Sequence, residues 1–191
     1  MHAAESKIPS APGTPNWYAL FTRYQHEKAV ASALSNKNHE VYLPLFRSVR
    51  QWQDRAKQLF LPLFPGYVFI RGGMDRQLQI LTSPGIIRIV GWSGRPAIVP
   101  QNQLDAVRQI IESNLYVETH PFLQSGDRVR VKTGPLKGLE GVLTRRKRKA
   151  QLVVSMEMLG RSAAVEIEVL NVERIGPFPA PKLSEAISAA V

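Results

Sequence analysis

Residues 126–143 constrain the fold more than any other part of the sequence. Val129-Arg130-Val131 alternates apolar and charged residues, as a half-buried strand does. Gly134, Gly138 and Gly141 follow within ten positions, and glycine permits positive φ angles and close approach of two backbones. Short apolar runs then recur at 142–143, 152–154, 163–167 and 169–175. Five short strands in about 50 residues, with no helical period, predict a small β-barrel.

The residues before this stretch have a different pattern. Aromatic and apolar runs predict strands, and apolar residues spaced three and four apart predict amphipathic helices. The expected strands are 17–22, 41–50, 58–64, 67–70, 86–90 and 97–99, with a hairpin tip at 51–57; the expected helices are 25–37, 74–81 and one starting at Pro100. This order predicts an α+β fold, in which a largely antiparallel amino-terminal sheet is flanked by helices and followed by the barrel.

Changes in composition divide the chain into five segments. Both ends are rich in proline and offer little to bury, which predicts disordered tails. A stretch with no clear period separates the two folded parts and is read as a linker. The expected segments are a tail at 1–15, an α+β domain at 16–113, a linker at 114–124, a barrel domain at 125–176 and a tail at 177–191.

Charge and composition point to a binding protein. The chain has 25 Lys and Arg against 15 Asp and Glu, a net charge of +10, which favours polyanionic partners such as nucleic acids. It has no cysteine, its four histidines lack metal-ligand spacing, and no catalytic grouping or phosphate-binding loop is evident. We therefore expect no enzymatic activity, cofactor or metal. The absence of a membrane span or signal-peptide pattern predicts a cytoplasmic protein, expected to be a monomer.

Two stretches resemble a known family. The string from Gly126 to Leu143 is similar to the KOW motif of NusG-type factors, with Gly141 at the signature glycine, and Met158–Ile167 is similar to the end of their carboxyl domains. Pro62-Leu63-Phe64-Pro65-Gly66-Tyr67-Val68-Phe69-Ile70 resembles the strand-turn-strand signature of their amino domain. The resemblance covers residues 16–176. Pro62–Pro65 and Arg50–Arg55 are most similar to the specialised paralogues, RfaH and the UpxY-like antiterminators.

The resemblance implies that the amino domain docks on bacterial RNA polymerase, at the clamp helices of its largest subunit. The matching residues are apolar or aromatic: Phe21, Phe64, Tyr67, Phe69 and Trp92. Strand alternation puts Tyr67 and Phe69 on one face and Val68 and Ile70 on the other. One of these faces must pack on helices, so the same aromatics could instead be core residues.

Several basic or polar residues are candidates for binding DNA or RNA. By resemblance to the specialised paralogues, Arg23, Asn36 and Lys37 would face the non-template DNA strand, although Ala33 stands where a polar reader is expected. On the hairpin, Arg50 and Arg55 suit phosphate contact and Trp52 suits base stacking, or Trp52 packs on its own hairpin. The block Arg145, Arg146, Lys147, Arg148, Lys149 is either an RNA-binding patch or a solvated loop.

The barrel is expected to recruit a second protein. By resemblance, the partner would be ribosomal protein S10 or the termination factor Rho, bound through Leu139, Met158, Leu159 and Arg161. Family members often have phenylalanine at two of these positions, and leucine loses the aromatic contact.

These residues predict a transcription elongation or antitermination factor that binds RNA polymerase and modulates pausing and termination, at specific operons. The alternative is a ribosome-associated or RNA-binding KOW protein that acts in translation, which the basic block at 145–149 would serve. The additional match over 16–113 favours the transcription factor, since a KOW motif alone is shared by both classes.

Overall fold

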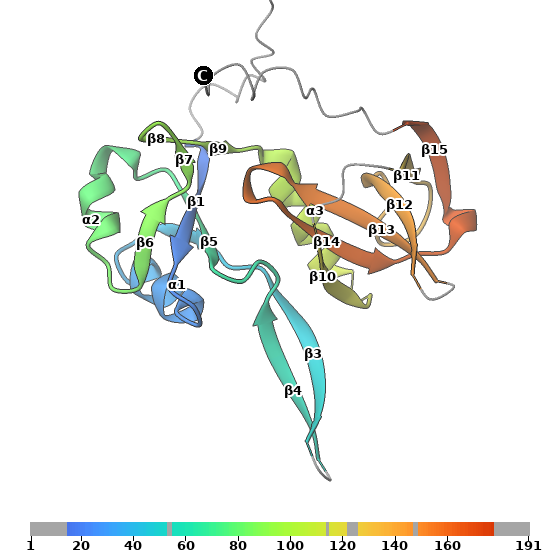
Figure 1. Cartoon of the computed structure of the whole chain (residues 1–191), viewed down its shortest axis with the longest axis horizontal. Coiled ribbons are helices and arrows are strands. Elements are labelled where there is room, and N and C mark those ends of the chain that lie inside the picture. Colours follow the sequence, from blue (N-terminus) through green and yellow to red (C-terminus); the bar gives the residue numbers. More distant parts are fainter. Residues whose placement is uncertain (1–14, 53–54, 114, 122–125, 147–148, 178–191) are drawn as a thin grey trace, which may run out of the picture. The chain divides into compact units, whose positions relative to one another are not determined.

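The computed structural model describes residues 15–52, 55–113, 115–121, 126–146 and 149–177 (Figure 1). These residues form two compact units. Unit 1 contains the described residues up to Leu43 and the segment Pro65–Gln101. Unit 2 contains the segment Pro44–Phe64 and the described residues from Asn102 onwards.

Unit 1 is an antiparallel sheet with helices on one face. The strands follow the order β2-β5-β1-β6, with β9 also paired to β1. A separate small hairpin joins β7 to β8. The elements are β1 Trp17–Thr22, α1 Glu27–Ser35, β2 Glu40–Tyr42, β5 Tyr67–Arg71, a 3-10 turn Met74–Arg76, α2 Gln77–Leu81, β6 Ile86–Ile89, β7 Gly91–Trp92, β8 Arg95–Pro96 and β9 Ile98–Val99.

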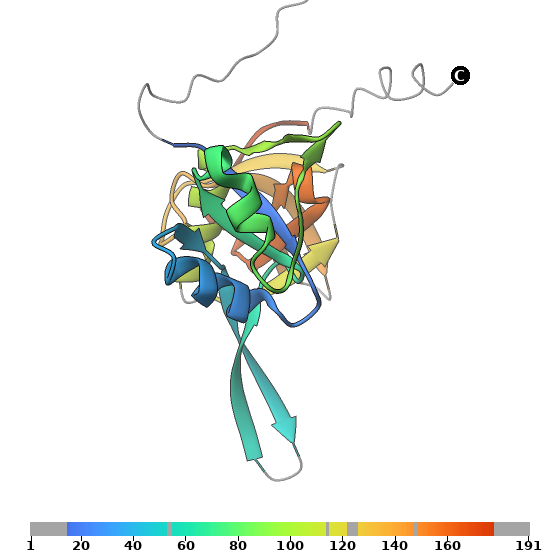
Figure 2. The same ribbon diagram turned by 90° about the vertical axis from the view of Figure 1, so that its left-hand side faces the viewer.

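The core of unit 1 lies between this sheet and the two helices. Strand alternation places Leu20, Val68 and Ile70 on the face that meets Val30 and Leu34 of α1, a pair one helical turn apart. These five residues are fully buried, and each contributes about 1.5–3 kcal/mol by leaving water. Figure 2 shows α1 and α2 together in front of the strands. The opposite face of the sheet therefore carries the alternate residues of β1 and β5.

Unit 2 contains a six-stranded antiparallel sheet, a two-stranded hairpin and one helix. The sheet follows the order β10-β14-β13-β12-β11-β15, and the hairpin pairs β3 with β4 (Figure 1). The elements are β3 Leu45–Trp52, β4 Arg55–Pro62, α3 Gln101–Glu112, β10 Val117–Pro121, β11 Asp127–Val131, β12 Glu140–Arg146, β13 Lys149–Met156, a 3-10 turn Glu157–Leu159, β14 Arg161–Glu166, a 3-10 turn Val169–Asn171 and β15 Val172–Pro177.

The predicted α+β fold class is confirmed: unit 1 is an α+β layer with an antiparallel sheet, and the carboxyl-terminal strands form a six-stranded antiparallel sheet that is consistent with the predicted small barrel. Differences from the sequence prediction lie at element ends. The helix expected at 25–37 spans Glu27–Ser35, because Gln25 and Asn38 have positive φ angles of 61° and 62°. The strand expected at 41–50 is interrupted at Pro44, which has no N–H to donate to a sheet.

The segment expected as a linker, 114–124, contains a strand. Val117 to Pro121 form β10, in which Val117 pairs with Val165 and Thr119 with Ala163. Val117 is buried, so this part of the chain is an edge strand of the barrel sheet. Residues 169–171, expected as strand, form a 3-10 turn.

The hairpin and α3, expected within the domain 16–113, group with unit 2. The two tails, expected at 1–15 and 177–191, lie outside the described residues except for Pro15 and Pro177. The domain boundaries therefore stay a prediction.

Candidate functional site

Five aromatic residues cover the face of the unit 1 sheet that points away from α1 and α2. We call this set, Trp17, Phe21, Tyr42, Tyr67 and Phe69, the aromatic face. Phe21 lies opposite Tyr67 across β1 and β5, and Tyr42 lies opposite Phe69 across β2 and β5. The ring centroids are 5.4 Å apart for Phe21 and Tyr67, 6.3 Å for Tyr42 and Phe69, and 6.5 Å for Trp17 and Tyr42. These spacings are typical of aromatic pairs.

Exposure separates the members of the aromatic face. Trp17 and Phe69 are 2% and 0% exposed, whereas Phe21, Tyr42 and Tyr67 are only partly buried. The predicted docking residues thus divide into the half-exposed pair Phe21 and Tyr67 and the buried Phe69. Sequence alternation placed Tyr67 and Phe69 on one face and Val68 and Ile70 on the other, and left open which face the helices cover. The structure places Val68 and Ile70 in the helix-covered core. Alternation carries no information on how much of each ring remains exposed.

The other two predicted docking residues lie in different surroundings. Phe64 is buried in unit 2, with 1% exposure. Trp92 is 85% exposed and lies on the β7–β8 hairpin, where it pairs with Arg95. Ser93 and Gly94, between them, have φ angles of 48° and 75°, as a two-residue hairpin turn requires. Trp92 is therefore accessible, and Phe64 serves packing.

One cation accompanies the half-exposed pair. The Arg88 guanidinium lies 5.3 Å from the centre of the Phe21 ring, and Arg88 pairs with Phe21 across β1 and β6. We call Phe21, Tyr67 and Arg88 the docking cluster. It presents aromatic surface and a positive charge on a rigid sheet, which suits an apolar partner surface that also carries an acidic group. No pattern in the sequence pointed to a functional role for Arg88.

A buried carboxylate holds the turn that precedes Tyr67. The Gly66 N–H donates to Glu27 Oε1 at 2.7 Å, and the Thr22 N–H donates to the Gly66 carbonyl at 2.8 Å. Glu27 is 4% exposed and lies in the first turn of α1. Gly66 has a φ of +85°, and a Cβ placed there would lie 3.2 Å from Phe21 Cε2. Sequence analysis identified the turn but not its carboxylate, since no local pattern links positions 27 and 66.

The residues proposed to face DNA lie around the segment 83–85. The Arg23 N–H donates to the Gly85 carbonyl at 2.8 Å, and Lys37 Nζ donates to Ser83 Oγ at 2.8 Å. Asn36 is the C-cap of α1, and all three predicted residues are exposed. The segment packs closely on α1, because a Cβ at Gly85 would lie 3.0 Å from Val30 Cγ2. The structure thus brings Arg23 and Lys37 to one edge of unit 1.

An exposed tyrosine accompanies this edge and was missed by the sequence analysis. Tyr24 is 78% exposed, and its carbonyl lies 2.9 Å from His26 Nδ1. The next residue, Gln25, has a φ of +61°, a conformation that few non-glycine residues adopt. A tyrosine ring beside Arg23 could stack on an unpaired base.

The remaining basic candidates lie at two β-hairpins. Trp52 and Arg55 are the last pair of β3 and β4, and Arg50 pairs with Lys57. Arg146 and Lys149 are the last pair of β12 and β13, and Arg145 pairs with Ala150. Lys147 and Arg148 lie outside the described residues. The described backbone therefore places both groups next to hairpin turns.

The four residues expected to bind a protein partner on the barrel differ in accessibility. Leu139 and Leu159 are buried, at 6% and 7% exposure, Met158 is half-buried and Arg161 is exposed. The two leucines therefore contribute mainly to packing, which leaves Met158 and Arg161 as the accessible members.

An ion cluster lies on β11 and β12, next to Leu139. Arg130 Nη2 is bonded to Glu140 Oε1 at 2.6 Å, and Arg128 Nη2 to Glu140 Oε2 at 2.9 Å. The hydrogen bond from Arg130 holds the pKa of the Glu140 carboxyl below its ordinary value, with Arg128 acting in the same direction. The pKa of Arg130 is raised by the same contact. Glu140 therefore ties these two arginines to the sheet.

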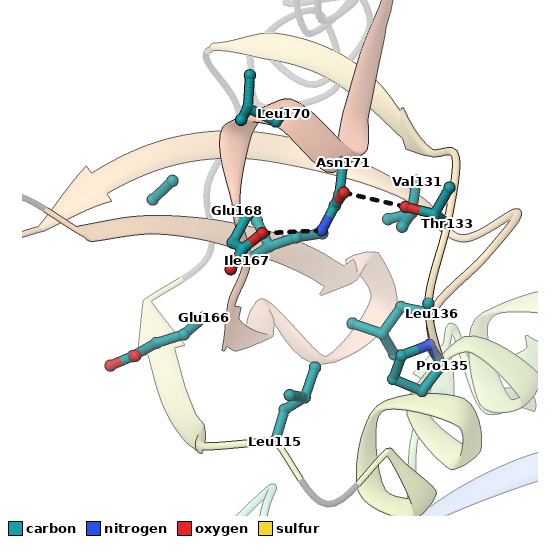
Figure 3. Close-up of a pocket in the computed structure, with 12 residues that line it drawn as sticks. Leu115, Val131, Thr133, Pro135, Leu136, Glu166, Ile167, Glu168, Leu170 and Asn171 are labelled. Carbon is teal, nitrogen blue, oxygen red and sulfur yellow. Dashed lines mark hydrogen bonds between the residues drawn. The ribbon is translucent and has the colours of Figure 1, made fainter.

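Unit 2 also contains a hollow of about 630 Å³ that the sequence gave no reason to expect (Figure 3). Its walls include the apolar residues Val131, Leu136 and Ile167. At its rim, the Thr133 hydroxyl donates to Asn171 Oδ1 at 3.0 Å, and Asn171 Nδ2 donates to Glu168 Oε2 at 3.3 Å. The chemistry of the hollow suits an apolar group.

The described residues hold neither a metal-binding cluster nor a membrane-crossing helix. No group of three or more His, Cys, Asp or Glu residues there is arranged to hold a metal ion. None of the helices in this part of the chain has the length and apolar character needed to cross a bilayer.

Comparison with known proteins gives one consistent result. Residues 15–108 match the family model NusG, described as transcription termination factor nusG. The transcription termination/antitermination protein NusG of Halalkalibacterium halodurans is 26% identical over 175 residues, covering 84% of this chain and 98% of that protein. The protein of the same description from Staphylococcus carnosus is 28% identical over 181 residues, covering 85% and 97%.

A solved structure that describes domain interaction in Thermotoga maritima NusG matches with a TM-score of 0.50. It is 22% identical in sequence, and the match covers 84% of this chain and 97% of that one. At this identity the match supports the fold.

Proposed function

We propose that the chain is a member of the NusG family and a transcription elongation and antitermination factor that binds bacterial RNA polymerase and modulates pausing and termination. The observation that carries this proposal is the docking cluster, which lies in the part of the chain that matches the family model. Half-exposed aromatic residues fixed on a sheet are typical anchors of protein interfaces.

The docking cluster suits the proposed polymerase surface, the clamp helices of the largest subunit. The Phe21 and Tyr67 rings, 5.4 Å apart, would bury apolar surface against a helix, and Arg88 would pair with an acidic side chain beside it. Burial of Trp17 and Phe69 on the same face keeps the face rigid, so little conformational entropy is lost on docking. Trp92, on its own hairpin, provides a further accessible aromatic ring.

The test measures the affinity of the full chain for core RNA polymerase from the same bacterium. We expect Phe21→Ala and Tyr67→Ala to cost about 2 kcal/mol or more each, as interface anchors do, a loss of about 30-fold. Leu78→Ala is the matched control, because Leu78 is 78% exposed on α2, on the other face of the sheet. Equal affinities for all three variants would contradict the proposed surface.

Operon specificity is the finer part of the proposal. It is supported by the cationic edge of Arg23 and Lys37, with the exposed Tyr24 beside it, which could contact the non-template DNA strand of a transcribing polymerase. Polymerase occupancy across the genome, with and without the protein, tests this role. Changes confined to a few long operons would support it, and a uniform change would indicate a general factor.

A second protein would bind the barrel through Met158 and Arg161, the accessible members of the predicted surface. Ribosomal protein S10 and Rho are the two proposed partners. Tethering either one to polymerase would raise its effective concentration at the transcript. The affinity of the chain for each purified protein, measured in turn, distinguishes the two partners. Arg161→Ala should weaken binding of the true partner.

A further inference from the structure

Glu27 is a buried carboxylate that is not part of the docking cluster. It is 4% exposed, and a charged group at such a position is costly unless hydrogen bonds replace its lost water. Its carboxylate accepts the Gly66 N–H at 2.7 Å, and its place in the first turn of α1 adds the favourable field of the helix amino terminus.

The Gly66 peptide is held from two sides. Glu27 of α1 binds its N–H, and the Thr22 N–H of β1 binds its carbonyl at 2.8 Å. The φ angle of +85° at Gly66 is one that glycine adopts without strain. The turn is therefore fixed to a helix and to a strand at the same time.

This bracing leads directly to the docking cluster. Tyr67 follows Gly66 in the chain, and the position of a Cβ at Gly66 lies only 3.2 Å from the Phe21 ring. Any shift of the Gly66 peptide therefore moves the Tyr67 ring relative to the Phe21 ring. The centroids of these two rings are 5.4 Å apart. Although α1 is on the helix side of the sheet, its bond to the Gly66 N–H links Glu27 to the docking cluster through this turn.

We propose that Glu27 is a positioning residue, which fixes the turn at Gly66 and so holds the Phe21 and Tyr67 rings in the arrangement that docks on the polymerase. The expected effect on polymerase affinity rests on the proposed function, but the hydrogen bonds that hold the turn are a property of the free protein. If Glu27 only stabilised the fold, replacing it would lower the free energy of unfolding without changing the arrangement of the two rings in the folded state.

The experiment compares Glu27→Leu, Glu27→Gln and the wild-type chain. Leucine removes the acceptor and leaves the Gly66 N–H buried and unpaired, whereas glutamine keeps an oxygen acceptor of the same reach. Leu34→Ala is the matched control, because Leu34 is fully buried in the helix-side core and its loss destabilises without touching the turn. Each protein is examined by NMR without polymerase, and then titrated with core polymerase.

We expect Glu27→Leu to lose the Phe21–Tyr67 ring contacts in the free protein while the signals of β1 and β5 persist. Its affinity for polymerase should fall about tenfold if the docking arrangement of the rings is then populated in about one free molecule in ten. Glu27→Gln should restore most of both properties. Leu34→Ala should keep the ring contacts and the affinity, despite a lower unfolding temperature.

Two results would overturn the inference. One is an unchanged ring contact in Glu27→Leu, and the other is an equal loss of affinity in Leu34→Ala. If Glu27→Leu does not fold, hydrogen exchange of the Gly66 amide in the wild-type chain decides instead: slow exchange, comparable with β5, supports the bracing, and fast exchange excludes it. Failure of the wild-type chain to bind polymerase would refute the proposed function, while the ring measurement would still decide the role of Glu27.

Discussion

Gly66 shows how one residue can combine a backbone requirement with a packing limit. Its φ of +85° disfavours any side chain, and a Cβ there would press on the Phe21 ring at 3.2 Å. Gly94 has a similar φ of +75°, but a Cβ there would meet nothing within 4 Å. The two glycines therefore separate the cost of the backbone conformation from the cost of crowding.

We predict that Gly66→Ala destabilises the chain more than Gly94→Ala does. Gly94→Ala should cost about 1 kcal/mol from the left-handed backbone alone, and Gly66→Ala should add a crowding cost of about 1 kcal/mol or more. Only Gly66→Ala should also weaken polymerase binding, because it displaces Phe21. Urea unfolding and polymerase titration measure the two effects. Equal unfolding midpoints would show that the Phe21 ring moves aside freely.

Glu140 provides a pH-dependent contribution to stability. Its folded-state pKa lies below the ordinary value of 4.5 because Arg130 and Arg128 hydrogen-bond to the charged carboxylate. A lowered folded pKa means that the stabilisation is fully present above the unfolded pKa and is lost as pH falls through the folded pKa. Both partners are partly exposed, so solvent and salt weaken the contribution.

We predict that Glu140→Gln lowers the unfolding temperature at pH 7, and that its difference from wild type shrinks between pH 5 and pH 3 (about the range around a carboxyl pKa). The difference should also shrink in about 1 M salt, where screening is strong. Thermal unfolding followed by circular dichroism measures both. A difference that stays constant with pH would mean that Glu140 acts through packing.

At the scale of elements, hydrophobic periodicity predicted most strands and helices, because each buries one face. It could not fix their ends: α1 lies between Gln25 and Asn38, which both have positive φ, and Pro44 lies between β2 and β3. Nor could it rank the aromatic residues, since Phe69 and Tyr67 alternate identically but only Phe69 is fully buried. Local patterns report which face a residue is on, and only the tertiary structure decides how deeply it is buried.

Contacts between distant segments were also beyond local patterns. The pairing of Glu27 with Gly66 spans 39 positions, and that of Lys37 with Ser83 spans 46. Resemblance to a family supplied Arg23 and Lys37 as candidates, but the fold explains why they share an edge: the segment 83–85 bonds to both.

We predict that Arg23→Gln combined with Lys37→Gln weakens binding of single-stranded DNA and reduces its salt dependence. If each residue neutralises one phosphate, the slope of log K against log salt should fall by about 1.4. Arg95→Gln, an exposed arginine of β8, is the control and should leave the slope nearly unchanged. Fluorescence anisotropy at several salt concentrations gives the slopes. An unchanged slope in the double variant would exclude phosphate contact at this edge.

At the scale of the whole molecule, the order of the hydrophobic patterns predicted an α+β part followed by a barrel, and a net charge of +10 predicted a polyanionic partner. The boundary between the parts was harder to place. The segment 114–124 has little apolar periodicity, yet β10 within it pairs along its whole length with β14. An edge strand can form with one buried side chain and a ladder of backbone hydrogen bonds. Because every residue type except proline can make these bonds, a hydrophobic pattern does not reveal them.

This pairing predicts where the carboxyl-terminal sheet begins. A fragment of residues 115–177 keeps β10, with five residues paired to β14 from Val117–Val165 to Pro121–Arg161. A fragment of residues 125–177 lacks β10. Without this strand, β14 becomes an unpaired sheet edge, and the surface that Val117 covers is exposed to water. We expect the longer fragment to unfold at a higher urea concentration. Its free energy of unfolding should be larger by about 1–2 kcal/mol, the range for burying one valine and covering a sheet edge. Val117→Ser in the longer fragment should remove part of this gain. Equal midpoints for the two fragments would mean that 115–121 adds nothing to the sheet, so that the boundary near 125 read from the sequence was the right one.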